Sequence, residues 1–189
     1  MLAANPKTTS PLRLDEEVRE IDAGLQRASN GKGFNLQVRW AVRVRDVSQA
    51  LLNFNPQIVH FCGHGGGDNG LALEDETGRL QYVSTAAIAE LFELFSQKNQ
   101  NNNQNNKNIE CVILNACYSE VQATAISQHI PYTIGMNKAI GDKASIEFTV
   151  GFYKALAAGK SIDFAYKLGC NTIAMAGIPE NLTPVIKVK

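Results

Sequence analysis

The stretch Pro56-Gln57-Ile58-Val59-His60-Phe61-Cys62-Gly63-His64-Gly65 decides the fold. It contains a nearly continuous apolar run, Ile58 to Cys62, that leads into a histidine and a row of glycines. A second run of this kind, Cys111 to Leu114, leads into Asn115-Ala116-Cys117. Continuous apolar runs are typical of parallel strands that helices cover on both faces. We therefore expect these two strands at the centre of a sheet.

Weaker patterns on either side complete a β-α-β alternation. Strict alternation of apolar and polar residues over 36–44 predicts a strand near a sheet edge, and Leu71 to Val83 is typical of a β-hairpin. Three more segments fit strands: 2–4, 132–136 and 184–188. Five segments fit helices: 14–28, 84–95, 118–129, 143–158 and 162–176. Asp46 is the expected N-cap of one more helix, which stops before Asn55-Pro56.

This order of elements predicts an α/β fold, a doubly wound and mostly parallel sheet with helices on both faces. With 189 residues and 44% hydrophobic content, the chain fits one domain over 1–189. The Asn/Gln-rich segment at 97–108 is too polar to pack and is expected to be a surface loop.

Composition excludes several classes of partner. Eighteen Lys and Arg balance eighteen Asp and Glu, so no global field attracts nucleic acid or an anionic membrane surface. No apolar stretch approaches the roughly 20 residues of a membrane-spanning helix, and the N-terminus lacks the pattern of a signal peptide. We expect a soluble, cytoplasmic protein with no nucleic-acid or membrane partner. Four irregularly spaced cysteines indicate thiol chemistry and not a disulfide framework.

His64 and Cys117 each follow a central strand, at the edge where such sheets build their sites. A cysteine peptidase needs a thiolate, a histidine that handles protons, and donors for the oxyanion. Cys117 is expected just ahead of a helix whose amides favour the thiolate. The amides of Gly65 and Cys117 are the expected oxyanion donors. The spacing of the histidine and the cysteine is close to the roughly 50 residues found in caspases.

Other functions compete with this interpretation. His60, Cys62 and His64 alternate onto one face and could hold a metal ion, but packing of His60 and Cys62 in a buried strand predicts the same pattern. Cys111 and Cys170 are expected in the core, and His129 is expected in the core or at its boundary. A nucleotide binder would need glycines in the loop at 5–9, which has none. We expect no metal and no cofactor, and a non-catalytic scaffold stays as the alternative to the enzyme.

At this point the residues resemble the CHAT family of bacterial caspase-like peptidases, relatives of separase and the metacaspases. The resemblance covers nearly the whole chain and is carried by five segments: 2–6, 12–19, 56–65, 114–117 and 152–156. It implies a caspase-like sheet of six strands in the order 2-1-3-4-5-6. It also implies peptide-bond hydrolysis by His64 and Cys117.

The resemblance further implies a pocket for a basic P1 side chain, with Asp142 and Asn115 as its candidate residues. Metacaspases carry an acid two residues before the cysteine, where this chain has neutral Asn115, so a weaker basic preference is expected. Asp142 is also a suitable N-cap for the following helix. CHAT domains are commonly fused to controlling modules, so we expect a regulatory domain or an activating partner protein besides the protein substrate.

Overall fold

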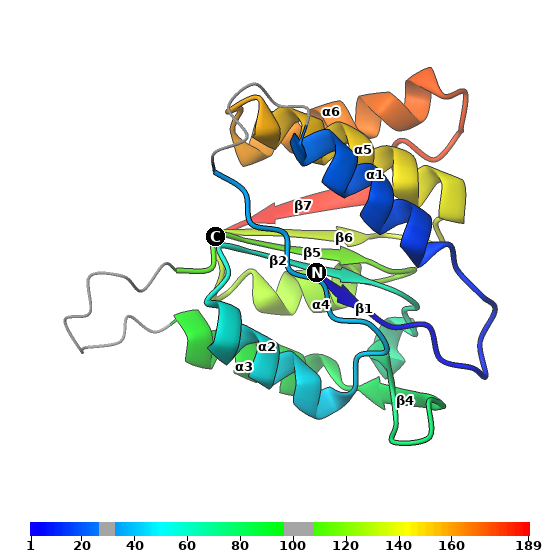
Figure 1. The fold of residues 1–189 in the computed structure, drawn as a ribbon, viewed down its shortest axis with the longest axis vertical. Helices are drawn as coiled ribbons and strands as arrows, with labels where there is room; N and C mark the ends of the chain where they lie inside the picture. Colours follow the sequence, from blue (N-terminus) through cyan, green and yellow to red (C-terminus); the bar gives the residue numbers. More distant parts are fainter. Residues whose placement is uncertain (27–32, 97–107) are drawn as a thin grey trace. The chain divides into compact units, whose positions relative to one another are not determined.

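The computed structural model describes residues 1–26, 33–96 and 108–189 (Figure 1). Nearly all of the predicted surface loop at 97–108 lies outside these residues. The chain divides into two compact units. The first comprises Met1–Pro11, Gln37–Lys138 and Val185–Lys189, and the second comprises Leu12–Leu36 and Ala139–Pro184. The single domain expected over 1–189 stays a prediction.

A mostly parallel sheet of five strands organises the first unit (Figure 1). In sheet order these are β1 (Leu2–Ala3), β2 (Ile58–Cys62), β5 (Cys111–Asn115), β6 (Tyr132–Met136) and β7 (Pro184–Val188). Strand β2 pairs in parallel with both β1 and β5. Every residue of β5 is buried, as are the last four residues of β2. The prediction that the two apolar runs form central strands is confirmed.

The segment 36–44, predicted as an edge strand, lies beside β1 at the edge of the sheet, where the Arg39 N–H donates to the Met1 carbonyl at 2.9 Å and the Ala3 N–H donates to the Arg39 carbonyl at 2.8 Å. It does not form the regular strand that was expected. Only single bridges form in this segment, from Arg39 to Leu2 and from Arg43 to Glu74. Ala41 has a left-handed backbone with a φ of 51°, which interrupts the extended chain, and Val44 already belongs to a helix. The alternating pattern therefore reflects a chain that bonds to the edge strand at single positions, and among the described residues the sheet has five strands and not the expected six.

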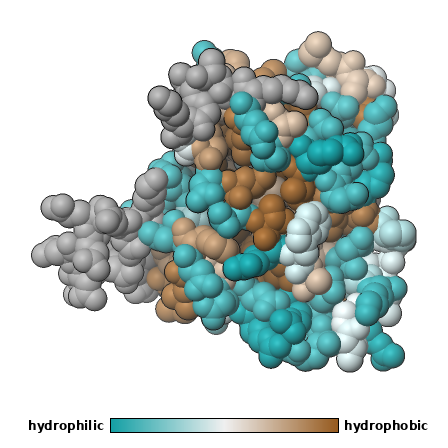
Figure 2. Space-filling view, viewed as in Figure 1, coloured by the Kyte–Doolittle hydropathy of each residue, from teal (hydrophilic) through white to brown (hydrophobic). Residues whose placement is uncertain are grey.

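Three helices of the first unit share an apolar core with one face of the sheet. They are α2 (Val44–Phe54), α3 (Thr85–Ser96) and α4 (Glu120–Ile126). Asp46 does not cap α2 as predicted, because Arg43 is the N-cap and the Asp46 carboxylate accepts from its backbone N–H at 3.0 Å. Figure 2 shows apolar side chains over the carboxyl ends of α2 and α3, where Leu52 and Leu94 are exposed.

The predicted hairpin is confirmed: β3 (Leu71–Glu74) pairs antiparallel with β4 (Leu80–Val83). Strand β3 is buried throughout, while β4 is largely exposed. A single 3-10 turn, η1 (Gly67–Asn69), leads into the hairpin. The hairpin is therefore joined directly to the glycine-rich segment that follows β2.

The second unit is built from α1 (Leu14–Gln26), α5 (Asp142–Ala157) and α6 (Ile162–Met175). Helices α5 and α6 approach closely because glycines lie at their contact. A Cβ atom at Gly169 would lie 2.7 Å from the Phe148 ring, and one at Gly151 would meet the Thr172 hydroxyl. No helix among the described residues is long and apolar enough to cross a membrane.

Candidate active site

The segment after β2 is held by backbone bonds to the hairpin. The His64 carbonyl accepts from the Ala72 N–H at 3.1 Å, and the Gly66 N–H donates to the Gly70 carbonyl at 2.9 Å. These two bonds flank a bridge between Gly65 and Leu71. In such an antiparallel pair the central residues direct their own N–H and C=O away from each other. The Gly65 N–H therefore points away from β3, which keeps it outside the hairpin ladder.

Cys117 lies in a tight turn after β5 and is half-buried. The next residue, Tyr118, has a left-handed backbone with a φ of 56°, and its N–H donates to the Lys138 carbonyl at 3.2 Å. Helix α4 begins only at Glu120, so the expectation of a helix from Tyr118 is wrong. The helix amides that were expected to favour a Cys117 thiolate do not follow the cysteine directly.

The structure brings the two strand-end segments into contact. The Gly63 N–H donates to the Asn115 carbonyl at 3.3 Å, which carries the β2–β5 pairing beyond the last paired strand residues. Further along, a Cβ atom at Gly65 would collide with the Cys117 carbonyl oxygen. Only glycine permits this approach of the two backbones. The predicted convergence of the segments after the central strands is therefore present in the backbone.

The His64 ring has an orienting partner that the sequence did not indicate. Its Nε2 lies 2.8 Å from the Ser10 carbonyl oxygen, in the segment after β1. A carbonyl can only accept, so Nε2 carries the proton in this bond. In the neutral ring Nδ1 then keeps its lone pair and is the available base. A backbone carbonyl leaves no signature in residue type, and for this reason the sequence could not identify it.

A buried glutamine fixes the glycine segment to the helix that follows Cys117. The Gln122 side chain of α4 is fully buried, and its Nε2 donates to the Gly67 carbonyl at 2.8 Å and to the Thr85 hydroxyl at 2.6 Å. It thereby joins the segments after β2 and β5 to the start of α3. Along the chain, only a polar residue on an otherwise apolar helix face could have indicated this role.

The two residues predicted for a P1 pocket lie in different units. Asn115 is the buried last residue of β5 in the first unit. Asp142 opens α5 in the second unit, where the N-cap is Gly141 and not Asp142 as expected. The Asp142 carboxylate accepts from the Arg13 Nε at 2.6 Å and from the Arg13 backbone N–H at 3.2 Å. This hydrogen bond raises the pKa of Arg13 above its usual value.

The remaining histidines and cysteines are largely withdrawn from solvent. His60 and Cys62 are buried in β2, and Cys111 is buried in β5. Burial raises the pKa of the Cys111 and Cys170 thiols, so both stay protonated at neutral pH. His129 lies in the turn after α4, and not within a helix as predicted. Among the described residues no group of three His, Cys, Asp or Glu could hold a metal ion.

The family model of the CHAT domain matches residues 2–167. The chain belongs to the CHAT domain family. A relative from Gillisia limnaea named "Probable protease" is 23% identical over 134 residues, which are 71% of this chain and 22% of the relative. The chain thus spans about a fifth of that relative's length.

A solved structure with a similar fold is a secreted C11 cysteine protease from Bacteroides thetaiotaomicron in complex with an irreversible peptide inhibitor. The TM-score is 0.63 at 14% sequence identity, and the match covers 99% of this chain and 65% of that one. The predicted α/β fold with a mostly parallel sheet is confirmed by this likeness and by the strand pairing. The CHAT domain therefore shares its fold with this solved structure.

Proposed function

We propose that the CHAT domain is a cysteine endopeptidase in which His64 and Cys117 form the catalytic dyad. One observation carries the proposal: the segments after β2 and β5 meet at Gly65 and the Cys117 carbonyl. Each segment holds one member of the pair, and both members are half-buried. Family membership supports peptide-bond hydrolysis as the reaction.

The hydrogen bond between His64 Nε2 and the Ser10 carbonyl supports Nδ1 as the nitrogen that transfers protons in this proposal. Nδ1 accepts the proton of the Cys117 thiol, and the sulfur attacks the scissile carbonyl carbon. The imidazolium then returns the proton to the leaving amine, which departs and leaves an acyl-enzyme. Water attacks the thioester and restores the thiol. The amides of Gly65 and Cys117 would donate to the oxyanion, and the direction of the Gly65 N–H supports that role.

For specificity we propose a basic P1 residue, with Asp142 supplying the carboxylate and Asn115 a neutral wall. Asp142 is already paired with Arg13, so a P1 arginine has to compete with an internal guanidinium. Arg13→Ala should therefore lower KM for substrates with arginine at P1, whereas Asp142→Asn should remove the preference for arginine over leucine. Steady-state kinetics on fluorogenic peptides that differ only at P1 measure both effects. A preference for aspartate or leucine in the unmodified protein would exclude a basic P1.

The experiment that tests the dyad is covalent labelling with a peptidyl acyloxymethyl ketone, followed by mass mapping of the modified thiol. We expect a thioether at Cys117, no labelling of Cys117→Ala, and much slower labelling of His64→Ala. Cys170→Ala is the matched control and should label at the unmodified rate, because burial keeps its thiol protonated. Equal labelling with and without the His64 ring would contradict the dyad and favour a non-catalytic scaffold.

A regulatory domain or partner protein is also part of the proposal. The hydrogen bonds that join the hairpin to His64 and Gly66 support it, because they give a surface element a direct connection to the site.

A further inference from the structure

Tyr118, the residue after Cys117, occupies a backbone conformation that suits glycine. Its φ is left-handed, which strains any residue with a Cβ atom and leaves glycine unstrained. The tyrosine is 51% exposed, so burial of its ring does little to offset that strain. Residues held in such conformations cluster at functional sites. Stability therefore does not account for a tyrosine at this position.

The turn is held by its backbone and by its neighbours, and it does not depend on the Tyr118 side chain. The buried Ser119 hydroxyl donates to the Leu114 carbonyl at 2.8 Å and accepts from the Met136 N–H at 3.0 Å. The Tyr118 N–H donates to the Lys138 carbonyl at 3.2 Å. These bonds tie the turn to β5 and to the end of β6, and they impose the left-handed backbone.

The base of the Tyr118 side chain lies next to the segment that follows His64. A Cβ atom added at Gly67 would lie 3.6 Å from the Tyr118 Cβ, which is an ordinary van der Waals contact. The Tyr82 ring of β4 lies against the adjacent Gly66, where an added Cβ would come within 2.5 Å of it, and Tyr82 is 44% exposed. Two exposed tyrosines therefore border this segment at consecutive glycines.

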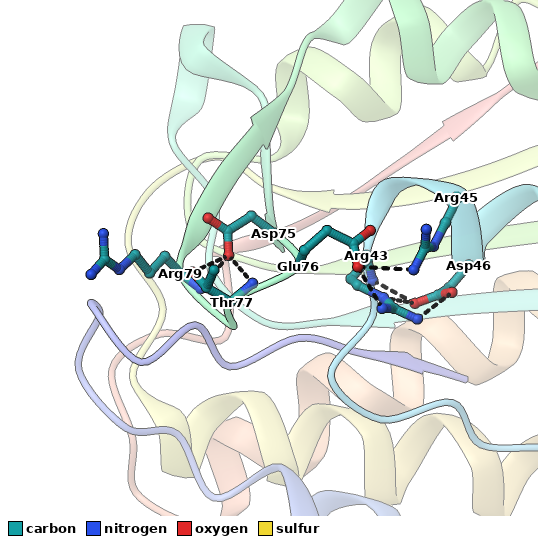
Figure 3. A network of polar contacts seen from close by, with 7 residues as sticks. All are labelled: Arg43, Arg45, Asp46, Asp75, Glu76, Thr77 and Arg79. Atoms are coloured by element: carbon teal, nitrogen blue, oxygen red, sulfur yellow. Dashed lines mark hydrogen bonds and ion pairs between the residues drawn. The ribbon is translucent and has the colours of Figure 1, made fainter.

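The charged groups at the turn of the hairpin that carries Tyr82 are engaged within the protein (Figure 3). The Asp75 carboxylate accepts from the Thr77 N–H at 2.7 Å inside the turn. Glu76 accepts from Arg43 Nη1 at 2.9 Å, which joins the turn to the N-cap of α2. These two acids therefore do not set the charge of the surface around Tyr82.

Two further acids are close to Tyr118 or Gly67 along the chain, and neither selects a charged side chain. Glu120, at the start of α4, is paired with Lys187 at 2.7 Å. Asp68 follows Gly67 and is exposed, so solvent screens its charge. Ring surface is therefore the feature of this segment that can discriminate between side chains.

We propose that Tyr118 is the specificity-determining residue of a subsite for an aromatic side chain at P1′, the residue on the carboxyl side of the scissile bond. The position rests on the proposed function. There the imidazolium returns its proton to the leaving amine, so the departing chain lies beside the segment that carries His64. The Tyr118 side chain borders that segment. An exposed ring favours an aromatic partner, because stacked or edge-on rings gain contact area and electrostatic complementarity.

Fluorescence anisotropy with the Cys117→Ala protein tests the subsite without any need for catalysis. The probe is a fluorescein-labelled hexapeptide with arginine at P1 and phenylalanine at P1′. Two matched peptides carry glycine or lysine at P1′, and a third has the same composition as the probe with phenylalanine moved to P3′. We expect the probe to bind at least tenfold more tightly than each matched peptide.

Three substitutions in the same protein assign the preference to the ring. Tyr118→Ala removes the ring and keeps the strained backbone, so it should reduce the preference for phenylalanine over glycine to less than twofold. Tyr118→Phe keeps the ring and should keep the preference. Trp40→Ala removes a ring of equal exposure, 52%, from the segment beside β1 and should leave the affinities unchanged.

Tyr118→Gly separates recognition from stability. It removes the ring and the backbone strain together, so it should lose the preference for phenylalanine and raise the midpoint of thermal unfolding. A ring that served only to stabilise the turn would lower the midpoint in this variant.

Three results would overturn the subsite: equal binding of the four peptides, a preference for lysine at P1′, or a preference for phenylalanine that survives Tyr118→Ala. Hydrolysis of the same peptides by protein with Cys117 intact reads the proposed function separately, with the cleaved bond identified by mass. Cleavage after arginine at a rate independent of P1′ would support the proposed function and contradict the subsite. An aromatic preference in binding without any cleavage would support the subsite and contradict the proposed function.

Discussion

At the scale of single residues, the position of Gly65 imposes the strictest requirement on the site. Gly65→Ala would drive a Cβ into the Cys117 carbonyl and force the two backbones apart. A displacement of about 1 Å costs roughly 100-fold in rate, so we expect labelling of Cys117 to fall by about that factor. Gly33→Ala is the control, because an added Cβ there meets no atom within 4 Å. An unchanged labelling rate in Gly65→Ala would show that the contact is not needed.

Ser10 acts through its backbone carbonyl, so a substitution of its side chain and a substitution of its neighbour Pro11 should have different effects on the rate of hydrolysis. Ser10→Ala keeps the carbonyl and should keep the rate of peptide hydrolysis. Pro11→Gly loosens the backbone that presents the carbonyl and should lower kcat by about fivefold, the value of a hydrogen bond worth roughly 1 kcal/mol. Equal kcat values for Pro11→Gly and the unmodified protein would contradict an orienting role for this carbonyl.

The strand ends that carry His64 and Cys117 could be predicted from the sequence, whereas the catalytic role of these residues stays a prediction. His64 and Cys117 stand at the ends of apolar strands, and both the residue types and the strand ends can be recognised along the chain. Ser10 and Gln122 could not be predicted. They contribute a backbone carbonyl and an amide that reach partners 54 and 55 residues away. Such contacts depend on tertiary folding and leave no periodic pattern.

At the scale of elements, α4 is tied to both the glycine segment and α3 by one side chain. Gln122→Met keeps the volume but leaves the Gly67 carbonyl and the Thr85 hydroxyl without this donor. We expect a loss of about 1–3 kcal/mol in the free energy of unfolding, measured by urea denaturation, together with a lower labelling rate at Cys117.

Thr85→Val is the matched control for that substitution. It removes one of the two partners and keeps the bond to Gly67, so it should lower stability less and leave the labelling rate unchanged. A Gln122→Met protein that is less stable but labels at the full rate would reduce the glutamine to a structural role.

Elements with continuous apolar runs were predicted correctly, whereas the alternating segment at 36–44 lies at the sheet edge without forming the regular strand that was expected. Burial on both faces constrains β2 and β5, and a single interpretation fits them. Alternation only requires every second side chain to be covered. The covered Val42 is fully buried although its neighbour Ala41 has a left-handed backbone. Local pattern could not reveal that turn.

At the scale of the whole molecule, the second unit depends on close packing between α5 and α6. Gly169→Ala would push a Cβ against Phe148, and overpacking costs roughly 1–3 kcal/mol. This exceeds the gain in helix propensity of up to about 1 kcal/mol. We expect a lower midpoint of thermal unfolding and faster hydrogen exchange in both helices.

Gly24→Ala is the matched comparison, and it should shift the midpoint of thermal unfolding in the opposite direction. An added Cβ in α1 would lie 3.8 Å from Lys154, which is an ordinary contact, so helix propensity should raise the unfolding midpoint. If both substitutions shift the midpoint in the same direction, packing at Gly169 does not have the role assigned to it.

The central claim is that the ring of residue 64 and the sulfur of residue 117 act on one scissile bond. A crystal structure of the chain with a peptidyl acyloxymethyl ketone bound measures this most directly. We predict a thioether at Cys117, with His64 Nδ1 about 3–4 Å from the sulfur and Nε2 still on the Ser10 carbonyl. An inhibitor attached to another thiol, or a His64 ring turned away from Cys117, would contradict the account.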